Sequence, residues 1–137
     1  MTTSNVLQKL IRACVDDGHT LRHECKFVDA ARAESLTRLA LERGQFVMDL
    51  ERLAKREQSH DGSWSELSRE VARGVWVAAA GRNNGDAITS CRHSRARTEA
   101  LYEEALRVSW PEEIHRVLTE QRRRLGDEAD ELNRLQF

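Results

Sequence analysis

Apolar residues recur every three or four positions along most of this chain, which is the spacing of one face of an α-helix. The clearest case is the stretch 36–54, LTRLALERGQFVMDLERLA. No segment alternates apolar and polar residues as a strand would, and the 137 residues include one proline. The sequence therefore predicts an all-α fold, with residues 1–137 forming a single domain. The stripe of the 36–54 helix consists of Leu36, Leu39, Phe46, Val47, Leu50, Leu53 and Ala54.

Two long helices are expected in the first half of the chain. Asn5 and Gln8 resemble a capping box that opens the first helix, whose apolar face runs as far as Val28. The segment 29–34 carries no apolar stripe, so we expect a short turn there before the second helix, which ends near Glu57.

The second half predicts a short helix and two further long ones. Ser63 and Glu66 form a capping box that opens the short helix, inside the connection between the second and third long helices. The third long helix is expected over 87–108, and Pro111 marks the start of the fourth. Long connections of this kind occur in four-helix bundles with a crossover, which include the ferritin-like folds.

The composition points to a reduced compartment and away from nucleic acid and membranes. Lys and Arg number 22 against 23 Asp and Glu, so the chain has no net basic field to attract nucleic acid or anionic lipid. No continuous apolar run suggests a signal peptide or a membrane span. Cys14, Cys25 and Cys91 are odd in number and widely spaced, which is typical of reduced thiols. We therefore expect a cytoplasmic protein.

A faint internal repeat accompanies a family resemblance. The segments SLTRLALERGQFV (35–47) and EIHRVLTEQRRRL (113–125) align without gaps and pair Glu42 with Glu120. With DDGHTLR in the first helix, LERGQF in the second, EALYEEAL in the third and GSWSELSREVARGVW between them, the chain resembles an uncharacterised bacterial family. That family is catalogued as a ferritin-like bundle of unknown function. The resemblance implies a ferritin-like up-down four-helix bundle with a long crossover that carries a short extra helix.

A ferritin-like di-metal centre needs carboxylates and histidines that this chain largely lacks. Such a centre takes one Glu from each of two helices and a Glu-x-x-His pair from each of the other two. Glu42 and Glu120 are present, but Gln45 and Arg123 stand where the histidines would be. The resemblance aligns the remaining acidic positions with His19 and Arg95. We therefore expect no metal and instead a buried polar layer of ion pairs: Glu42, Gln45, Arg95, Glu120, Arg123 and Glu128. Arg43, next to Glu42, is a further candidate cation for these glutamates.

Two metal sites remain as alternatives. One is a di-iron or di-manganese oxidase or storage site with an altered ligand set of Glu42, Glu120, Glu128, His19 and Glu24. The other is a zinc site, because His19 and His23 lie one helical turn apart, with Glu24 beside them.

The main functional hypothesis is a non-catalytic bundle with an interaction or stress-associated role. No nucleophile elbow, P-loop or Gly-rich phosphate loop occurs in the sequence. Trp64, Trp76 and Trp110 are large apolar side chains that serve either the core or a contact with a protein partner, including a second copy in a homodimer. Core packing is the favoured interpretation for each of the three.

Overall fold

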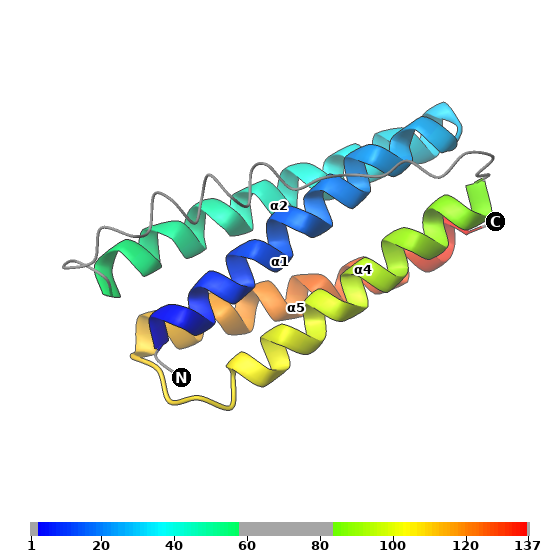
Figure 1. The fold of residues 1–137 in the computed structure, drawn as a ribbon. Helices are drawn as coiled ribbons and strands as arrows, with labels where there is room; N and C mark the ends of the chain where they lie inside the picture. Colours follow the sequence, from blue (N-terminus) through cyan, green and yellow to red (C-terminus); the bar gives the residue numbers. More distant parts are fainter. Residues whose placement is uncertain (1–2, 58–83, 137) are drawn as a thin grey trace.

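The computed structural model describes residues 3–57 and 84–136, and within these ranges every regular element is helical (Figure 1). The all-α prediction is therefore confirmed for these parts of the chain. The predicted short helix, with Trp64 and Trp76, lies outside the described residues. The elements are α1 (Thr3–Glu24), the 3-10 turn η1 (Cys25–Phe27), α2 (Ala30–Glu57), α4 (Asn84–Ala105) and α5 (Glu112–Leu135).

The described helices form two antiparallel hairpins that pack against each other. η1 joins α1 to α2, and residues 106–111 join α4 to α5. α1 also lies beside α4, and α5 lies beside α2, so the helices surround a common interior. The end of α2 and the start of α4 lie at opposite ends of the bundle (Figure 1).

Three predicted helix boundaries are wrong. α1 begins at Thr3, ahead of the predicted cap Asn5, and α4 spans Asn84–Ala105 rather than 87–108. The expected turn at 29–34 is helical from Ala30 onward, because Asp29 caps α2: the Arg32 backbone N–H donates to Asp29 Oδ1 at 2.9 Å. α4 ends at Ala105, where Trp110 Nε1 donates to the Ala105 carbonyl at 2.8 Å. α5 begins directly after Pro111, as predicted.

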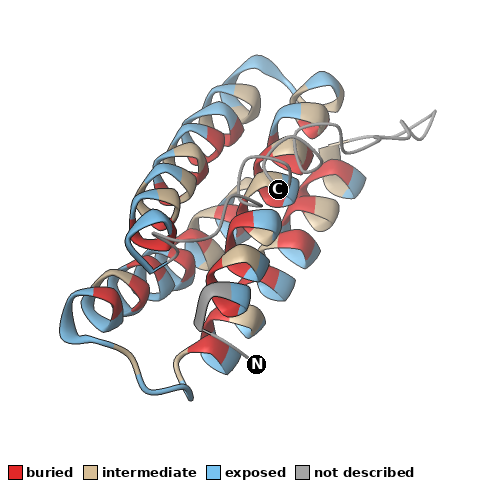
Figure 2. Cartoon of the chain, turned by 60° about the vertical axis from the view of Figure 1, so that its left-hand side comes forward, coloured by how far each residue is buried: buried red, intermediate tan, exposed pale blue. Residues whose placement is uncertain are grey.

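The interior consists of two apolar clusters at different levels along the bundle. On each helix the buried positions face the other helices (Figure 2). One cluster includes Cys14, Leu50, Tyr102 and Leu118, and the other includes Leu21, Leu36, Ile88, Cys91 and Leu132. Each of the described helices α1, α2, α4 and α5 has a buried polar residue at the level between these two clusters. The apolar core is therefore interrupted by a polar level that crosses the whole bundle.

Candidate functional site

The most unusual feature of the bundle is a buried polar level with one residue from each described helix. We call Asp17 (α1), Arg43 (α2), Ser94 (α4) and Glu128 (α5) the central polar layer. Their relative exposures are 1%, 1%, 4% and 3%, so all four residues are buried. Charged side chains are almost never buried to this extent unless they are paired.

Arg43 is the hub of the central polar layer. Its Nε donates to Asp17 Oδ2 at 2.7 Å, and its Nη2 donates to Glu128 Oε1. Ser94 Oγ donates to Asp17 Oδ1 at 2.6 Å, which occupies the second oxygen of that carboxylate. The Arg43 guanidinium carbon also lies 4.9 Å from the centre of the Phe46 ring, in cation–π range. One guanidinium thus links α2 to α1 and α5.

The electrostatics keep Arg43 charged. Burial opposes its charge, but the neighbouring Asp17 and Glu128 carboxylates outweigh burial and raise the pKa of Arg43 above its usual range. A planar guanidinium suits this position, because its several N–H groups can bind two carboxylates at once. The layer is therefore a set of charge-assisted hydrogen bonds, not an isolated buried charge.

The Glu128 carboxyl has an unusual pKa for a glutamate. Burial raises the pKa of Glu128 to about 8, although the Arg43 charge acts in the opposite direction. Its neighbour Glu42 lies within hydrogen-bonding reach and raises the pKa of Glu128 further. Glu42 itself is half-buried and pairs with Arg124, whose Nε donates to Glu42 Oε1 at 3.2 Å. Despite partial burial, these contacts hold the pKa of Glu42 below its usual range.

A chain of neutral groups lies beside the central polar layer. Tyr102 contacts Cys14 Sγ at 3.4 Å through its hydroxyl and donates to Gln121 Oε1. Gln121 Nε2 in turn donates to the Phe46 carbonyl at 3.4 Å. Burial raises the pKa of Cys14 to about 12 and that of Tyr102 well above its usual value. Cys14 is therefore a thiol at neutral pH and is not activated as a nucleophile.

The structure corrects much of the predicted polar layer. Of the predicted members only Glu128 is buried, and Gln45, Glu120 and Arg123 are exposed. Arg123 pairs with Glu120 and Asp127 on its own helix, and these ion pairs lie on the exposed surface of α5. These three side chains point outward because their positions on α2 and α5 lie off the buried stripe of each helix.

Two further predicted members are half-buried and have other partners than expected. Arg95 donates to Glu99 Oε2 and to the Leu125 carbonyl, both at 3.0 Å, and not to any of the predicted glutamates. Glu42 does face an arginine, but this arginine is Arg124 rather than Arg95 or Arg123.

Sequence reasoning missed Asp17 and Ser94, although a signal was present for both. Asp17 lies between Cys14 and Leu21 at helical spacing, on the apolar face of the first helix. Ser94 follows Cys91 by three residues on the inner face of α4. When several helices each carry a polar residue on their apolar face, these residues are expected to meet at one level of the bundle.

The alternative metal ligands are not brought together. Among residues 3–57 and 84–136, no group of three or more His, Cys, Asp or Glu side chains could hold a metal ion. Glu120 is exposed, Glu42 binds Arg124 and Glu128 binds Arg43, so these carboxylates already have cationic partners or face solvent. The His23 ring packs against Phe27 at a centroid distance of 5.4 Å. The described donors therefore fit neither the di-metal site nor the zinc site.

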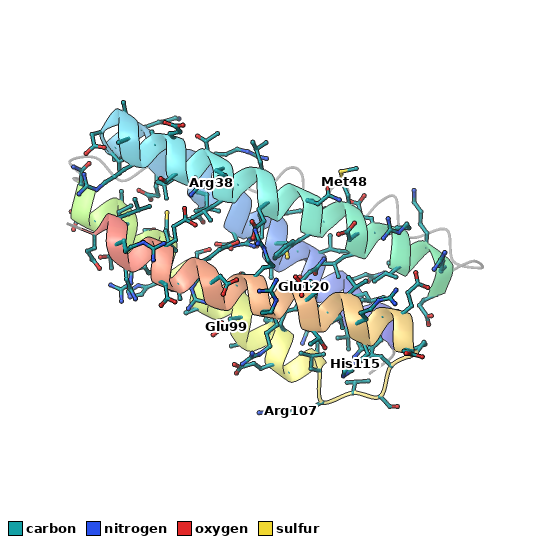
Figure 3. The ribbon with its side chains drawn as sticks, turned by 180° about the vertical axis from the view of Figure 1, so that it is seen from behind. Arg38, Met48, Glu99, Arg107, His115 and Glu120 are labelled. Carbon is teal, nitrogen blue, oxygen red and sulfur yellow. The ribbon has the colours of Figure 1, made fainter. Side chains whose placement is uncertain are left out.

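Two surface grooves reach toward the central polar layer. A groove of about 680 Å³ between α2 and α5 is lined by Glu42, Phe46 and Gln121, among others. Figure 3 shows this side of the bundle, with α2 and α5 in front and Glu120, another lining residue, on α5. A second groove, of about 360 Å³ between α1 and α4, is lined in part by Ser94. Solvent therefore approaches the layer through Glu42 on one side and Ser94 on the other.

Comparisons with known proteins return no relatives. The chain matches no protein-family model, no curated protein and no solved structure. Within the described ranges, no helix has the length and apolar character that a membrane span requires. The ferritin-like resemblance accordingly stays a prediction from sequence motifs.

Proposed function

We propose that this chain is a non-catalytic ferritin-like bundle in which an arginine-centred set of ion pairs takes the place of a di-metal site. The observation that carries the proposal is Arg43, which is 1% exposed and bound by carboxylates from α1 and α5. Two antiparallel hairpins, with α2 ending and α4 beginning at opposite ends of the bundle, support the ferritin-like architecture.

The charge of the layer supports a structural role for Arg43. A cation is needed between carboxylates that project inward from opposite helices, and a guanidinium supplies it without any metal. A divalent ion at the same level would meet the positive charge of Arg43 at close range. In this proposal the layer organises the interior, and the biological role lies on the surface.

The surface role that we propose is binding of a protein partner, with a second copy of the chain as the simplest case. Leu41 and Met48 are 67% and 64% exposed on α2 and lie seven residues apart, so they share one face of the helix. Figure 3 shows Met48 pointing away from the other helices. Trp110 instead packs against the apolar core, which favours the core interpretation for this tryptophan.

Elemental analysis of protein purified without added chelator tests the proposal. We expect no stoichiometric transition metal and no rise in Tm on addition of Fe²⁺ or Mn²⁺. Light scattering on the same sample is expected to show a defined oligomer, and Leu41→Glu combined with Met48→Glu is expected to dissociate it. Two tightly bound metal ions per chain would contradict the non-catalytic proposal, whatever the oligomeric state.

A further inference from the structure

The acidic groups at the α5 end of the central polar layer outnumber the basic groups that contact them. Asp17 and Glu128 bind Arg43, and Glu42 binds Arg124 while lying within hydrogen-bonding reach of Glu128. Three carboxyl groups therefore meet two guanidinium groups. The cluster is electrically neutral only if one carboxyl group carries a proton, and a net buried charge is costly in a sealed interior.

We propose that Glu42 and Glu128 share one proton at neutral pH, and that the release of this proton in mildly alkaline solution loosens α5 against α2. The proposal concerns protonation of the layer and does not depend on the ferritin-like architecture or on the absence of a metal.

The geometry places the proton on Glu128. Its Oε1 accepts a hydrogen bond from Arg43, whereas its Oε2 is buried and receives no N–H or O–H hydrogen bond from the described residues. A proton on Oε2 turns this oxygen into a donor toward the Glu42 carboxylate. Glu42 is the weaker candidate for the proton because it is half-buried and already accepts hydrogen bonds from Arg124. The raised pKa of Glu128 and the lowered pKa of Glu42 agree with this assignment.

Four groups around Glu128 keep their charge state in the same pH range. Arg43 and Arg124 stay protonated, because carboxylate neighbours outweigh burial and raise both pKa values. Cys14 and Tyr102 stay neutral, because burial raises the pKa of each far above neutrality. Among residues 3–57 and 84–136, the groups that face this cluster are Asp17 and Cys14 from α1, Glu42 and Arg43 from α2, Tyr102 from α4 and Arg124 from α5.

Proton release is expected to weaken the α2–α5 contact in particular. Glu42 lies on α2 and Glu128 on α5, so losing the shared proton places two negative charges face to face across this contact. The groove between α2 and α5 reaches Glu42 and provides a route for the proton to solvent. Other links across the same contact, such as Arg56–Glu113 at 2.5 Å, are exposed ion pairs that contribute little.

The sign of the pH effect follows from linkage. The pKa of Glu128 is about 8 in the folded protein, against an ordinary value of 4.5. Between pH 4.5 and about 8, Glu128 therefore keeps a proton in the native state that it has lost in the unfolded state. The stabilisation from this proton is complete below about pH 4.5 and is lost as pH rises through about 8.

An NMR titration of the glutamate side-chain carboxyl carbons in the wild-type protein tests the proposal directly. We expect the Glu128 signal, assigned through its own backbone, to titrate with a midpoint near 8. Titration of Glu128 below about pH 6 would overturn the proposal, because a carboxyl with an ordinary pKa holds no proton at neutrality. This measurement does not require any variant to fold.

Glu128→Gln provides the second test, with Glu120→Gln as the matched control on the exposed face of the same helix. The amide can accept from Arg43 and donate to Glu42, as protonated Glu128 does, but cannot lose a proton. Between pH 6 and 9 we expect the Tm of the wild type and of Glu120→Gln to fall by roughly 9 °C. Glu128→Gln should not show this fall, and an equal fall in all three proteins would overturn the proposal.

Amide hydrogen exchange, corrected for intrinsic pH dependence, locates the loosening. Above pH 8.5 we expect faster exchange in residues 121–128 of α5 in the wild type, and unchanged exchange in Glu128→Gln. Equal acceleration in all four described helices would contradict a local effect on the α2–α5 contact.

Discussion

Arg43 Nε and Asp17 Oδ2 lie 2.7 Å apart across the α1–α2 contact, and each side chain is 1% exposed. A fully buried ion pair contributes little net stability, because desolvation of both charges offsets their attraction. Removing one partner lowers the free energy of unfolding by far more than the intact pair adds to it. This asymmetry decides what substitutions in the central polar layer should do.

Arg43→Met should destabilise the protein strongly. The substitution leaves Asp17 and Glu128 buried without their cation, which typically costs about 3–5 kcal/mol of the free energy of unfolding. Urea unfolding at pH 7 measures the loss. Arg124→Met is the matched control, because it removes a guanidinium from a surface ion pair with Glu42 and should cost at most about 1 kcal/mol. Equal losses in the two variants would show that Arg43 is not held as described.

Replacing the whole charged set by apolar residues should recover the stability that Arg43→Met loses. We expect Asp17→Leu, Arg43→Met and Glu128→Leu together to be as stable as the wild type, or more stable by about 1–4 kcal/mol. Ser94 then loses its acceptor, so Ser94→Ala belongs in the same variant. A combined variant that is less stable than Arg43→Met alone would contradict this expectation.

Gly44→Ala should stabilise α2. A Cβ at Gly44 would meet no atom within 4 Å, and the residue lies in the interior of a long helix. Alanine there should add about 0.5–1 kcal/mol to the free energy of unfolding, measured in urea. At Gly18 the added Cβ would lie 3.8 Å from Arg43 Cβ and Cγ, an ordinary packing distance, so Gly18→Ala should also fold. Destabilisation by Gly44→Ala would indicate that another surface covers this position.

Thiol reactivity should separate the three cysteines. Cys14 and Cys91 are buried, whereas Cys25 is half-buried. Burial also raises the pKa of Cys14 to about 12, so its reactive thiolate is scarce at pH 8. We expect a thiol reagent to modify Cys25 first in the native protein and to modify all three in urea. Cys25→Ser should remove the fast phase, and its persistence would place one of the other cysteines at the surface.

The helical architecture could be predicted because it depends on the spacing of apolar residues. The stripe from Leu36 to Ala54 contains six buried residues and the half-buried Val47, and α5 begins directly after Pro111 as predicted. The predicted turn at 29–34 failed for a local reason. Asp29 caps a helix that needs no apolar stripe in its first turn, and weak patterning there does not indicate a break.

The polar site was harder to predict because side-chain partners depend on how the helices are rotated. Glu42 and Glu120 match in the internal repeat, yet Glu42 is half-buried and Glu120 is exposed. The alignment of the two segments shows which residue types correspond. It does not show which way each side chain points from its own helix, and that direction determines burial. Gln121 and Glu128 interrupt the apolar heptad of α5 and are both buried, so those interruptions were the more informative signal.

The level of the central polar layer between two apolar clusters limits how the helices can be aligned lengthwise. Rows of leucine and alanine fit against each other nearly as well after a shift of one helical turn, about 5.4 Å. Such a shift of α2 would move Arg43 away from Asp17 and Glu128 and into hydrocarbon surroundings. The layer therefore fixes the lengthwise register of the helices. It adds little to the free energy of unfolding, but it raises the free energy of every shifted alignment above that of the native one.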